Sequence, residues 1–191
     1  TLITLVTLDH FSHFAFRQQL TLCPHSLSRW EPGRLSQEIF MKIALIFPPF
    51  YLEPMYNLPP LGLINLATAL KGFPHRVVLM DFALAIRQGA LKRRKDIYDN
   101  CVERILAEAP DLVGFSAQCT TYPAVIQISK KIKGRDPHVK IVMGGHNASF
   151  VDQITLERHP FIDAIVRGEG EVTFRELVDA CAEGTTWKNV K

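Results

Sequence analysis

Between Met41 and Ala182 the apolar positions alternate between two patterns. Short continuous apolar runs, typical of strands that are buried on both faces, alternate with segments whose apolar residues recur at helical spacing. The predicted strands cover residues 42–47, 76–80, 112–116, 140–143 and 164–166. The predicted helices cover residues 63–70, 96–109, 121–133, 150–158 and 173–182.

Strands that alternate with helices predict parallel pairing through right-handed crossovers. We therefore expect an α/β fold, namely a flavodoxin-like (Rossmann-like), doubly wound, parallel five-stranded sheet with strand order 2-1-3-4-5. Ligands of such sheets bind outside the carboxyl ends of the strands, and the strand order reverses between strands one and three. The loops that follow the strands are therefore the candidate site.

The first forty residues lack this alternation. They show no sustained periodicity, and the run at residues 42–47 has the features of an opening strand. We expect residues 1–40 to be a poorly ordered extension outside the domain, from upstream sequence or a gene-boundary error. The alternative is a short, loosely attached N-terminal arm. The domain itself is expected over residues 41–184.

Composition argues against several classes of protein. The chain has 47% hydrophobic and 21% charged residues, which is ordinary for a globular protein, and its net charge of +3 does not indicate a nucleic-acid partner. No apolar run approaches the ~20 residues of a membrane span. No cysteine pair has CxxC spacing, so we interpret the cysteines as reduced thiols of a cytoplasmic protein: Cys23, Cys101, Cys119 and Cys181.

The loop after the first strand is rich in proline and aromatic residues. Pro49, Phe50 and Tyr51 stand near its start, and Leu58 and Gly62 near its end. Prolines make the loop stiff and extended, so one interpretation is a rigid connector. The other is a wall that packs on the flat face of a ligand, with Gly62 permitting close approach at the helix entrance.

The loop after the third strand carries small hydroxyl residues. Ser116 ends the strand, and Gln118, Thr120 and Thr121 follow it. Thr120 or Thr121 could cap the next helix, which is the structural interpretation. Capping does not explain Ser116, which stands where the strand would emerge beneath a bound ligand.

The loop after the fourth strand begins with Gly144 and Gly145, and His146 follows. Two glycines after a buried strand form a tight turn, or they let a ligand lie against bare backbone. A lone histidine such as His146 is more often structural than a ligand.

The loop after the fifth strand contains Gly168, Glu169, Gly170 and Glu171. This is not a GxGxxG motif, and two carboxylates at a helix start would repel a phosphate. The loop therefore argues against a dinucleotide pyrophosphate. Glu169 could accept hydrogen bonds from ribose or amide groups of a ligand.

Four segments together are more specific than any one of them. Residues 59–62, 113–116, 143–146 and 168–171 resemble the N-terminal cobalamin-binding domain of B12-dependent radical SAM enzymes. The resemblance implies that cobalamin lies across the strand ends with its nucleotide tail between the sheet and the flanking helices. It gives these candidate cofactor-binding residues: Pro49, Phe50, Tyr51, Leu58, Gly62, Ser116, Gln118, Thr120, Gly144, Gly145, His146, Gly168, Glu169 and Gly170.

The resemblance also assigns roles within that set. Ser116 and Thr120 would contact the buried tail, and Gly144 and Gly145 would leave room for it. The glycines and the carboxylate of residues 168–170 would lie beside the ribose or the corrin side chains.

The sequence departs from related cobalamin domains in two places. The methionine-synthase type carries a DxHxxG loop after strand one, whose histidine ligates cobalt, whereas residues 48–60 contain no histidine. This implies base-off cobalamin without a protein histidine ligand, with Tyr51 or Leu52 at that place. The chain also lacks CxxxCxxC, so [4Fe–4S] and S-adenosylmethionine are expected only in a radical SAM half outside it, reached through a linker that begins at residues 185–191.

The function that we expect is therefore a cobalamin-binding module of a methyl-transferring radical SAM enzyme, without turnover by this chain alone. Its expected partners are a corrinoid and a radical SAM domain in cis, with no nucleic acid and no membrane. One alternative is a ligand-free flavodoxin-like interaction domain. Another is an independent small α/β enzyme that uses Cys119 with His146.

Overall fold

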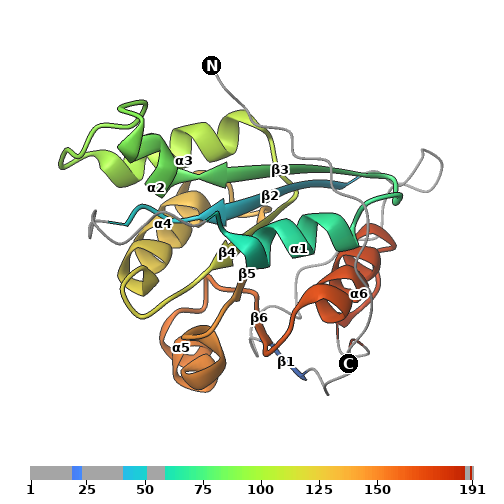
Figure 1. The fold of residues 1–191 in the computed structure, drawn as a ribbon. Coiled ribbons are helices and arrows are strands. Elements are labelled where there is room, and N and C mark those ends of the chain that lie inside the picture. The colour runs from blue at the N-terminus through green and yellow to red at the C-terminus, as the bar shows by residue number, and fades with distance from the viewer. Residues whose placement is uncertain (1–18, 23–40, 51–58, 188–189, 191) are drawn as a thin grey trace.

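Six strands and six α-helices form one layered α/β unit among the described residues (Figure 1). This computed structural model describes residues 19–22, 41–50, 59–187 and 190. The strands are β1 (Gln19–Leu22), β2 (Met41–Phe47), β3 (His75–Asp81), β4 (Leu112–Ser116), β5 (Lys140–Gly144) and β6 (Ala164–Arg167). The helices are α1 (Leu61–Ala69), α2 (Phe82–Arg87), α3 (Ile97–Ala107), α4 (Tyr122–Arg135), the 3-10 turn η3 (Ala148–Phe150), α5 (Asp152–Arg158) and α6 (Glu171–Ala182).

The sheet has the order β1-β6-β5-β4-β2-β3. Its parallel part, β3-β2-β4-β5-β6, is the predicted order 2-1-3-4-5, so the predicted fold class is confirmed. The added strand β1 was not expected: it pairs antiparallel with β6, from Gln19 opposite Arg167 to Leu22 opposite Ala164. The domain boundaries and the character of the remaining residues of 1–40 stay predictions.

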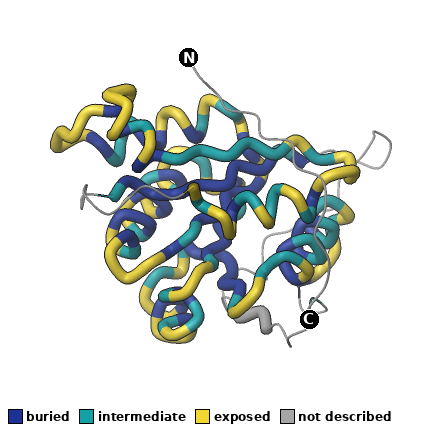
Figure 2. The backbone as a smooth tube through the Cα atoms, viewed as in Figure 1, coloured by how far each residue is buried: buried dark blue, intermediate teal, exposed yellow. Residues whose placement is uncertain are grey.

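Side chains of each strand alternate between the two faces of the sheet. In β2, Ala44 and Ile46 belong to the core packed under α2, α3, α4 and α5, whereas Ile43 and Leu45 belong to the core under α1 and α6. Figure 2 shows the central strands as buried and the outer faces of the helices as exposed. Both faces are therefore covered, which explains why the strands have continuous apolar sequences.

Two local features differ from the sequence prediction. The helix α2 was not predicted, because six residues are too few to display a helical repeat; the Asp81 side chain caps it by accepting a hydrogen bond from the Leu84 N–H at 2.8 Å. The helix predicted at residues 150–158 is divided into η3 and α5.

No helix among the described residues is both long enough and apolar enough to cross a membrane.

Candidate functional site

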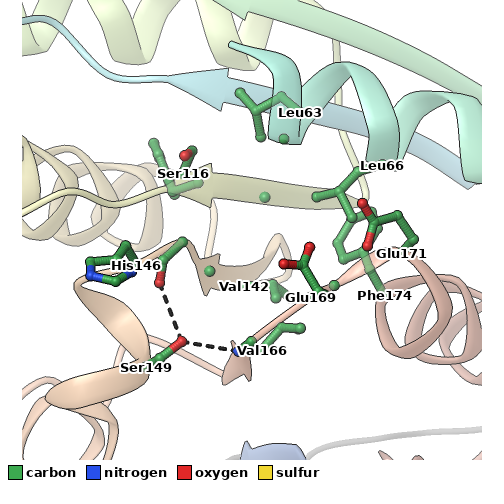
Figure 3. Close-up of a pocket in the computed structure, with 17 residues that line it drawn as sticks. Leu63, Leu66, Ser116, Val142, His146, Ser149, Val166, Glu169, Glu171 and Phe174 are labelled. Carbon is green, nitrogen blue, oxygen red and sulfur yellow. Dashed lines mark hydrogen bonds between the residues drawn. The ribbon is translucent and has the colours of Figure 1, made fainter. Parts of the chain in front are cut away.

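A cavity of about 320 Å³ opens at the carboxyl ends of β4, β5 and β6, between α1 and α6 (Figure 3). Leu63 and Leu66 of α1 form one wall, and Phe174 of α6 forms the facing wall. Val142 and Val166 contribute from β5 and β6. The cavity therefore lies at the edge of the sheet where a doubly wound fold binds its ligand.

The structure brings many of the predicted site residues together at this cavity. Those that line it are Gly62, Ser116, Gly144, Gly145, His146, Gly168, Glu169 and Gly170. Four sequence-distant loops therefore converge on one space, as the topology predicts.

Four other predicted residues that the structure describes, Pro49, Phe50, Gln118 and Thr120, do not line the cavity. Pro49 is buried, and Phe50 packs against the core beneath α1 and α6. Gln118 and Thr120 are exposed, because the buried Thr121 hydroxyl accepts a hydrogen bond from the Gln118 N–H at 2.9 Å and turns this loop back on itself. Tyr51 and Leu58 lie outside the described residues, as does Leu52.

The glycines of the cavity serve different purposes. Gly145 has a φ of +97°, and a Cβ there would lie 2.9 Å from the Ala117 carbonyl oxygen, so the backbone itself requires glycine. A Cβ on Gly144 would make only an ordinary contact of 3.6 Å with the Val166 carbonyl oxygen. A Cβ on Gly62 would meet no atom within 4 Å. Gly145 thus shapes a tight turn, whereas Gly62 borders open space.

Ser149 connects two of the cavity loops. Its hydroxyl accepts a hydrogen bond from the Gly168 N–H at 3.0 Å and donates one to the Gly145 carbonyl at 3.4 Å (Figure 3). Ser149 was not among the residues predicted from the sequence. Its position four residues after Gly145 is the available signal, since serine commonly bonds back to the carbonyl four residues earlier.

The apolar walls were predicted only as core positions. A Cβ on Gly114 would lie 3.4 Å from the Phe174 ring, and a Cβ on Gly170 would lie 3.3 Å from Leu66 Cδ2. Gly114 therefore lets Phe174 approach β4 closely, and Gly170 lets Leu66 approach the start of α6 closely. Helical periodicity shows that Leu66 and Phe174 face inward, but not that they face each other across a cavity.

Most polar side chains of the lining lie apart from the apolar walls, with Glu171 beside Phe174 as the exception. Figure 3 shows Ser116, His146 and Ser149 at one end of the cavity, with Glu169 between them and the apolar walls. The Glu169 carboxylate is exposed and has no hydrogen-bond or ion-pair partner among the described residues. His146 stands edge-on to Phe150, with ring centroids 5.2 Å apart. The cavity can thus accept a flat apolar group and bond the polar groups attached to it.

The structure does not favour a Cys119–His146 pair. His146 lines the cavity, but Cys119 is exposed, does not line it, and has no hydrogen-bond partner among the described residues. A thiolate nucleophile needs a base within hydrogen-bond reach. Within the described part of the chain, no three His, Cys, Asp or Glu side chains converge as metal ligands.

The family profile and the similar proteins point to the same family. The B12 binding domain profile matches residues 52–178. An uncharacterized methyltransferase of Pyrococcus horikoshii is 34% identical over 155 residues, covering 78% of this chain and 31% of that protein. The hopanoid C-3 methylase of Methylococcus capsulatus is 32% identical over 146 residues, covering 74% of this chain and 26% of that protein. This chain thus spans about a third or less of the length of these relatives.

A third relative, matched over a shorter segment, has a name that states its cofactor. The cobalamin-dependent radical SAM methyltransferase TokK of Streptomyces tokunonensis is 35% identical over 69 residues, which is 36% of this chain and 10% of that protein.

Proposed function

The chain belongs to the B12-binding domain family, and from this premise we propose that it binds cobalamin with the nucleotide tail in the cavity between α1 and α6. The observation that carries this proposal is the combination of a buried apolar floor with a polar rim at the strand carboxyl ends. Cobalamin's tail has the matching chemistry, since an apolar benzimidazole is joined to a ribose. Such segregation favours one orientation of the tail, with the base innermost.

The size of the cavity supports the same assignment. A volume of about 320 Å³ lies at the small end of the ~300–1,000 Å³ typical of ligand pockets, so it suits a nucleotide base and not a corrin ring. Gly62 lines this cavity, and a Cβ there would meet no atom within 4 Å, so a larger side chain can be placed at the border of the cavity. The corrin ring would lie outside, over the strand ends.

Individual residues would then have distinct roles. Ser116 and Ser149 would face the sugar end of the tail, where the Ser116 hydroxyl can donate or accept a hydrogen bond and the Ser149 hydroxyl, which donates to Gly145, can accept one. Glu169 would accept hydrogen bonds from ribose hydroxyls or corrin amides. Phe50 would support the loop beneath the corrin. Bound cobalamin supplies cobalt chemistry, including methyl-group transfer, while the protein holds and orients it.

We also propose that cobalamin is held base-off, because its benzimidazole would occupy the cavity. Residues 48–60 contain no histidine, so that loop offers no imidazole to replace it on cobalt. The names of the relatives given above support a role in methyl transfer within a longer radical SAM enzyme. We propose that this enzyme acts in the cytoplasm. In that enzyme [4Fe–4S] and S-adenosylmethionine would bind to a radical SAM domain in cis, since residues 1–191 contain no CxxxCxxC motif.

The test is retention of hydroxocobalamin by the 191-residue chain. After mixing and desalting, the protein should keep a red chromophore whose visible spectrum has shifted to that of the base-off form. The variant Gly62→Leu should lose most of this chromophore, because the new side chain would extend into the cavity.

The matched control is Gly134→Leu. Gly134 is also a helical glycine whose added Cβ would meet nothing within 4 Å, but it does not line the cavity. This variant should retain cobalamin as the wild type does. A colourless wild-type protein after desalting contradicts the proposal and favours a ligand-free interaction domain. Equal retention by Gly62→Leu places the tail elsewhere.

A further inference from the structure

The lining of the cavity separates by burial into two chemical classes. All of its buried residues are apolar: Leu63, Gly114, Phe115, Val142, Val166 and Phe174. Its polar side chains are only half-buried or exposed: Ser116, His146, Ser149, Glu169 and Glu171. The deepest part of the cavity therefore lacks polar side chains.

The backbone of the strands beneath the cavity takes part in sheet hydrogen bonding. Gly114 is paired with Leu45 on one side and Val142 on the other, and Val142 is paired in turn with Ala164. Val166 lies opposite Leu20 of β1. Gly114 and Val142 have a paired strand on both sides, so their N–H and C=O groups are used within the sheet, whereas Val166 is paired with β1 alone. The backbone of Gly114 and Val142 therefore offers little hydrogen bonding to a ligand.

We propose that this cavity selects among corrinoids by their lower base, favouring benzimidazole-type bases over purines. The inference rests on the proposed function, since it requires the tail to lie in the cavity. Dimethylbenzimidazole presents methyl groups and aromatic carbon to Leu66, Val142 and Phe174, and burial of that surface is favourable. A purine base brings ring nitrogens, and in adenine an exocyclic amine, that lose hydrogen bonds to water without replacement.

Glu171 is the polar side chain that could reduce this discrimination. It lies near Phe174 and Leu66 in Figure 3, and its carboxylate can accept a hydrogen bond from an exocyclic amine. It cannot donate one to a ring nitrogen when ionised. The hydroxyls of Ser116 and Ser149 lie at the opposite end of the cavity, nearer the expected place of the sugar. Purine nitrogens in the floor would therefore stay unpaired.

The test compares hydroxocobalamin with its adenine-containing analogue, pseudocobalamin. In free pseudocobalamin the base detaches from cobalt more easily than in cobalamin. The ratio of the two dissociation constants of one protein therefore reflects this difference between the free ligands as well as the selectivity of the protein. The difference belongs to the free ligands and cancels when the ratio is compared between wild type and variant. The informative quantity is thus the change in the ratio of the two dissociation constants, measured by equilibrium dialysis.

The first variant is Val142→Thr, which keeps the shape of the side chain but adds a hydroxyl to the floor. It should shift the ratio toward pseudocobalamin by roughly tenfold, the value of one hydrogen bond to a buried group. Because a buried hydroxyl can destabilise the fold, Leu66→Gln is the second variant: Leu66 is half-buried and tolerates a polar group better. It should shift the ratio in the same direction.

The matched control is Val113→Thr. Val113 is a buried strand residue of the opposite core, and it does not line the cavity, so this variant should leave the ratio at the wild-type value. Cobinamide, which lacks the nucleotide tail, should bind more weakly than cobalamin to all of these proteins.

The outcomes separate the two proposals. If the wild type retains cobalamin but neither Val142→Thr nor Leu66→Gln changes the ratio, the selectivity is wrong and cobalamin binding stands. Equal affinity for cobinamide and cobalamin also overturns the selectivity, because the tail is then outside the cavity. If neither corrinoid is retained, both proposals fail together.

Discussion

Asp163 at the amino end of the sheet and Glu169 at the carboxyl end show how differently the two ends use their charges. Asp163 is buried, accepts a hydrogen bond from the Ile141 N–H at 2.7 Å and lies 2.8 Å from Lys133 Nζ. Glu169 is exposed and has no partner among the described residues. Asp163 therefore joins elements of the fold, whereas Glu169 is available to a ligand.

A second aspartate continues this pattern at the amino end. The Asp111 carboxylate accepts a hydrogen bond from the Lys42 N–H at 2.8 Å, and its backbone bonds to both Lys42 and Lys140. These contacts join the starts of β2, β4 and β5. The comparison teaches that stability and ligand binding should be separable by mutation at opposite ends of the same strands.

The largest effect is expected for Asp163→Ala. The change removes the acceptor of Ile141 and leaves Lys133 and Lys140 without their buried counter-charge, so the free energy of unfolding should fall by about 3 kcal/mol. Urea unfolding followed by circular dichroism measures this loss. The counterpart Glu169→Ala should change stability by less than about 0.5 kcal/mol. Equal losses in the two variants would remove the distinction between the ends.

The next effect is expected for Gly145→Ala, which tests a fold requirement within the carboxyl end. The positive φ and the close Ala117 carbonyl oxygen should together destabilise the protein by roughly 1–3 kcal/mol. Gly168→Ala is the control: its φ is also positive, at +67°, but no atom lies within 4 Å of the added Cβ. It should lose about 1 kcal/mol. A larger loss for Gly168→Ala would refute the role of the Ala117 contact.

A smaller effect is expected for Ser149→Ala. Losing the hydroxyl that joins Gly145 to Gly168 should lower the free energy of unfolding by about 1 kcal/mol. Affinity for hydroxocobalamin should also fall, because two cavity loops are no longer tied together. Ser149→Thr keeps the hydroxyl and should recover much of both losses. Full affinity in Ser149→Ala would show that this bridge does not shape the site.

The smallest effect concerns thiol reactivity and leaves stability unchanged. Burial raises the pKa of Cys101 and of Cys181 to about 12, whereas Cys119 is exposed in the loop after β4. In a Cys23→Ser background, iodoacetamide at neutral pH should therefore alkylate Cys119 alone, as mass spectrometry would show. Alkylation of Cys101 or Cys181 in the folded protein would contradict their burial.

The same pKa values set a pH dependence. A thiol whose pKa is raised by folding contributes stability that is complete below its unfolded pKa of about 9 and is lost as the pH rises toward 12. The double variant Cys101→Ala, Cys181→Ala should therefore lose less stability than the wild type between pH 9 and pH 12.

The sequence was sufficient to predict what depends on local pattern. Continuous apolar runs indicated the parallel strands, because strands that are buried on both faces are apolar throughout. The rules for crossover connections then limited the possible strand orders. The strand β1 could not be predicted in this way, because its four residues are recognised as a strand only through pairing with β6. The helix α2 could not be predicted either, because its six residues are too few to show a helical repeat.

In the candidate site, too, some features follow from local sequence pattern and others depend on tertiary packing. The sequence pattern could predict that Gly62, Ser116 and Glu169 come together at one cavity, because parallel strands bring their carboxyl ends together. The cavity walls depend on how α1 and α6 pack across the sheet, which no local repeat encodes. Gln118 and Thr120 lie outside the cavity lining, in a loop turned by the hydrogen bond from the Gln118 N–H to the Thr121 hydroxyl, so their contact with a ligand stays a prediction.

The two walls of the cavity come from opposite ends of the domain in sequence. Leu63 and Leu66 follow the first parallel strand, whereas Phe174 follows the last. A chain synthesised from its N-terminus therefore cannot complete this cavity, the proposed site of the nucleotide tail, until α6 has emerged and docked beside α1. Cobalamin would load only after synthesis of the domain, and the binding energy would then help to keep its last helix in place.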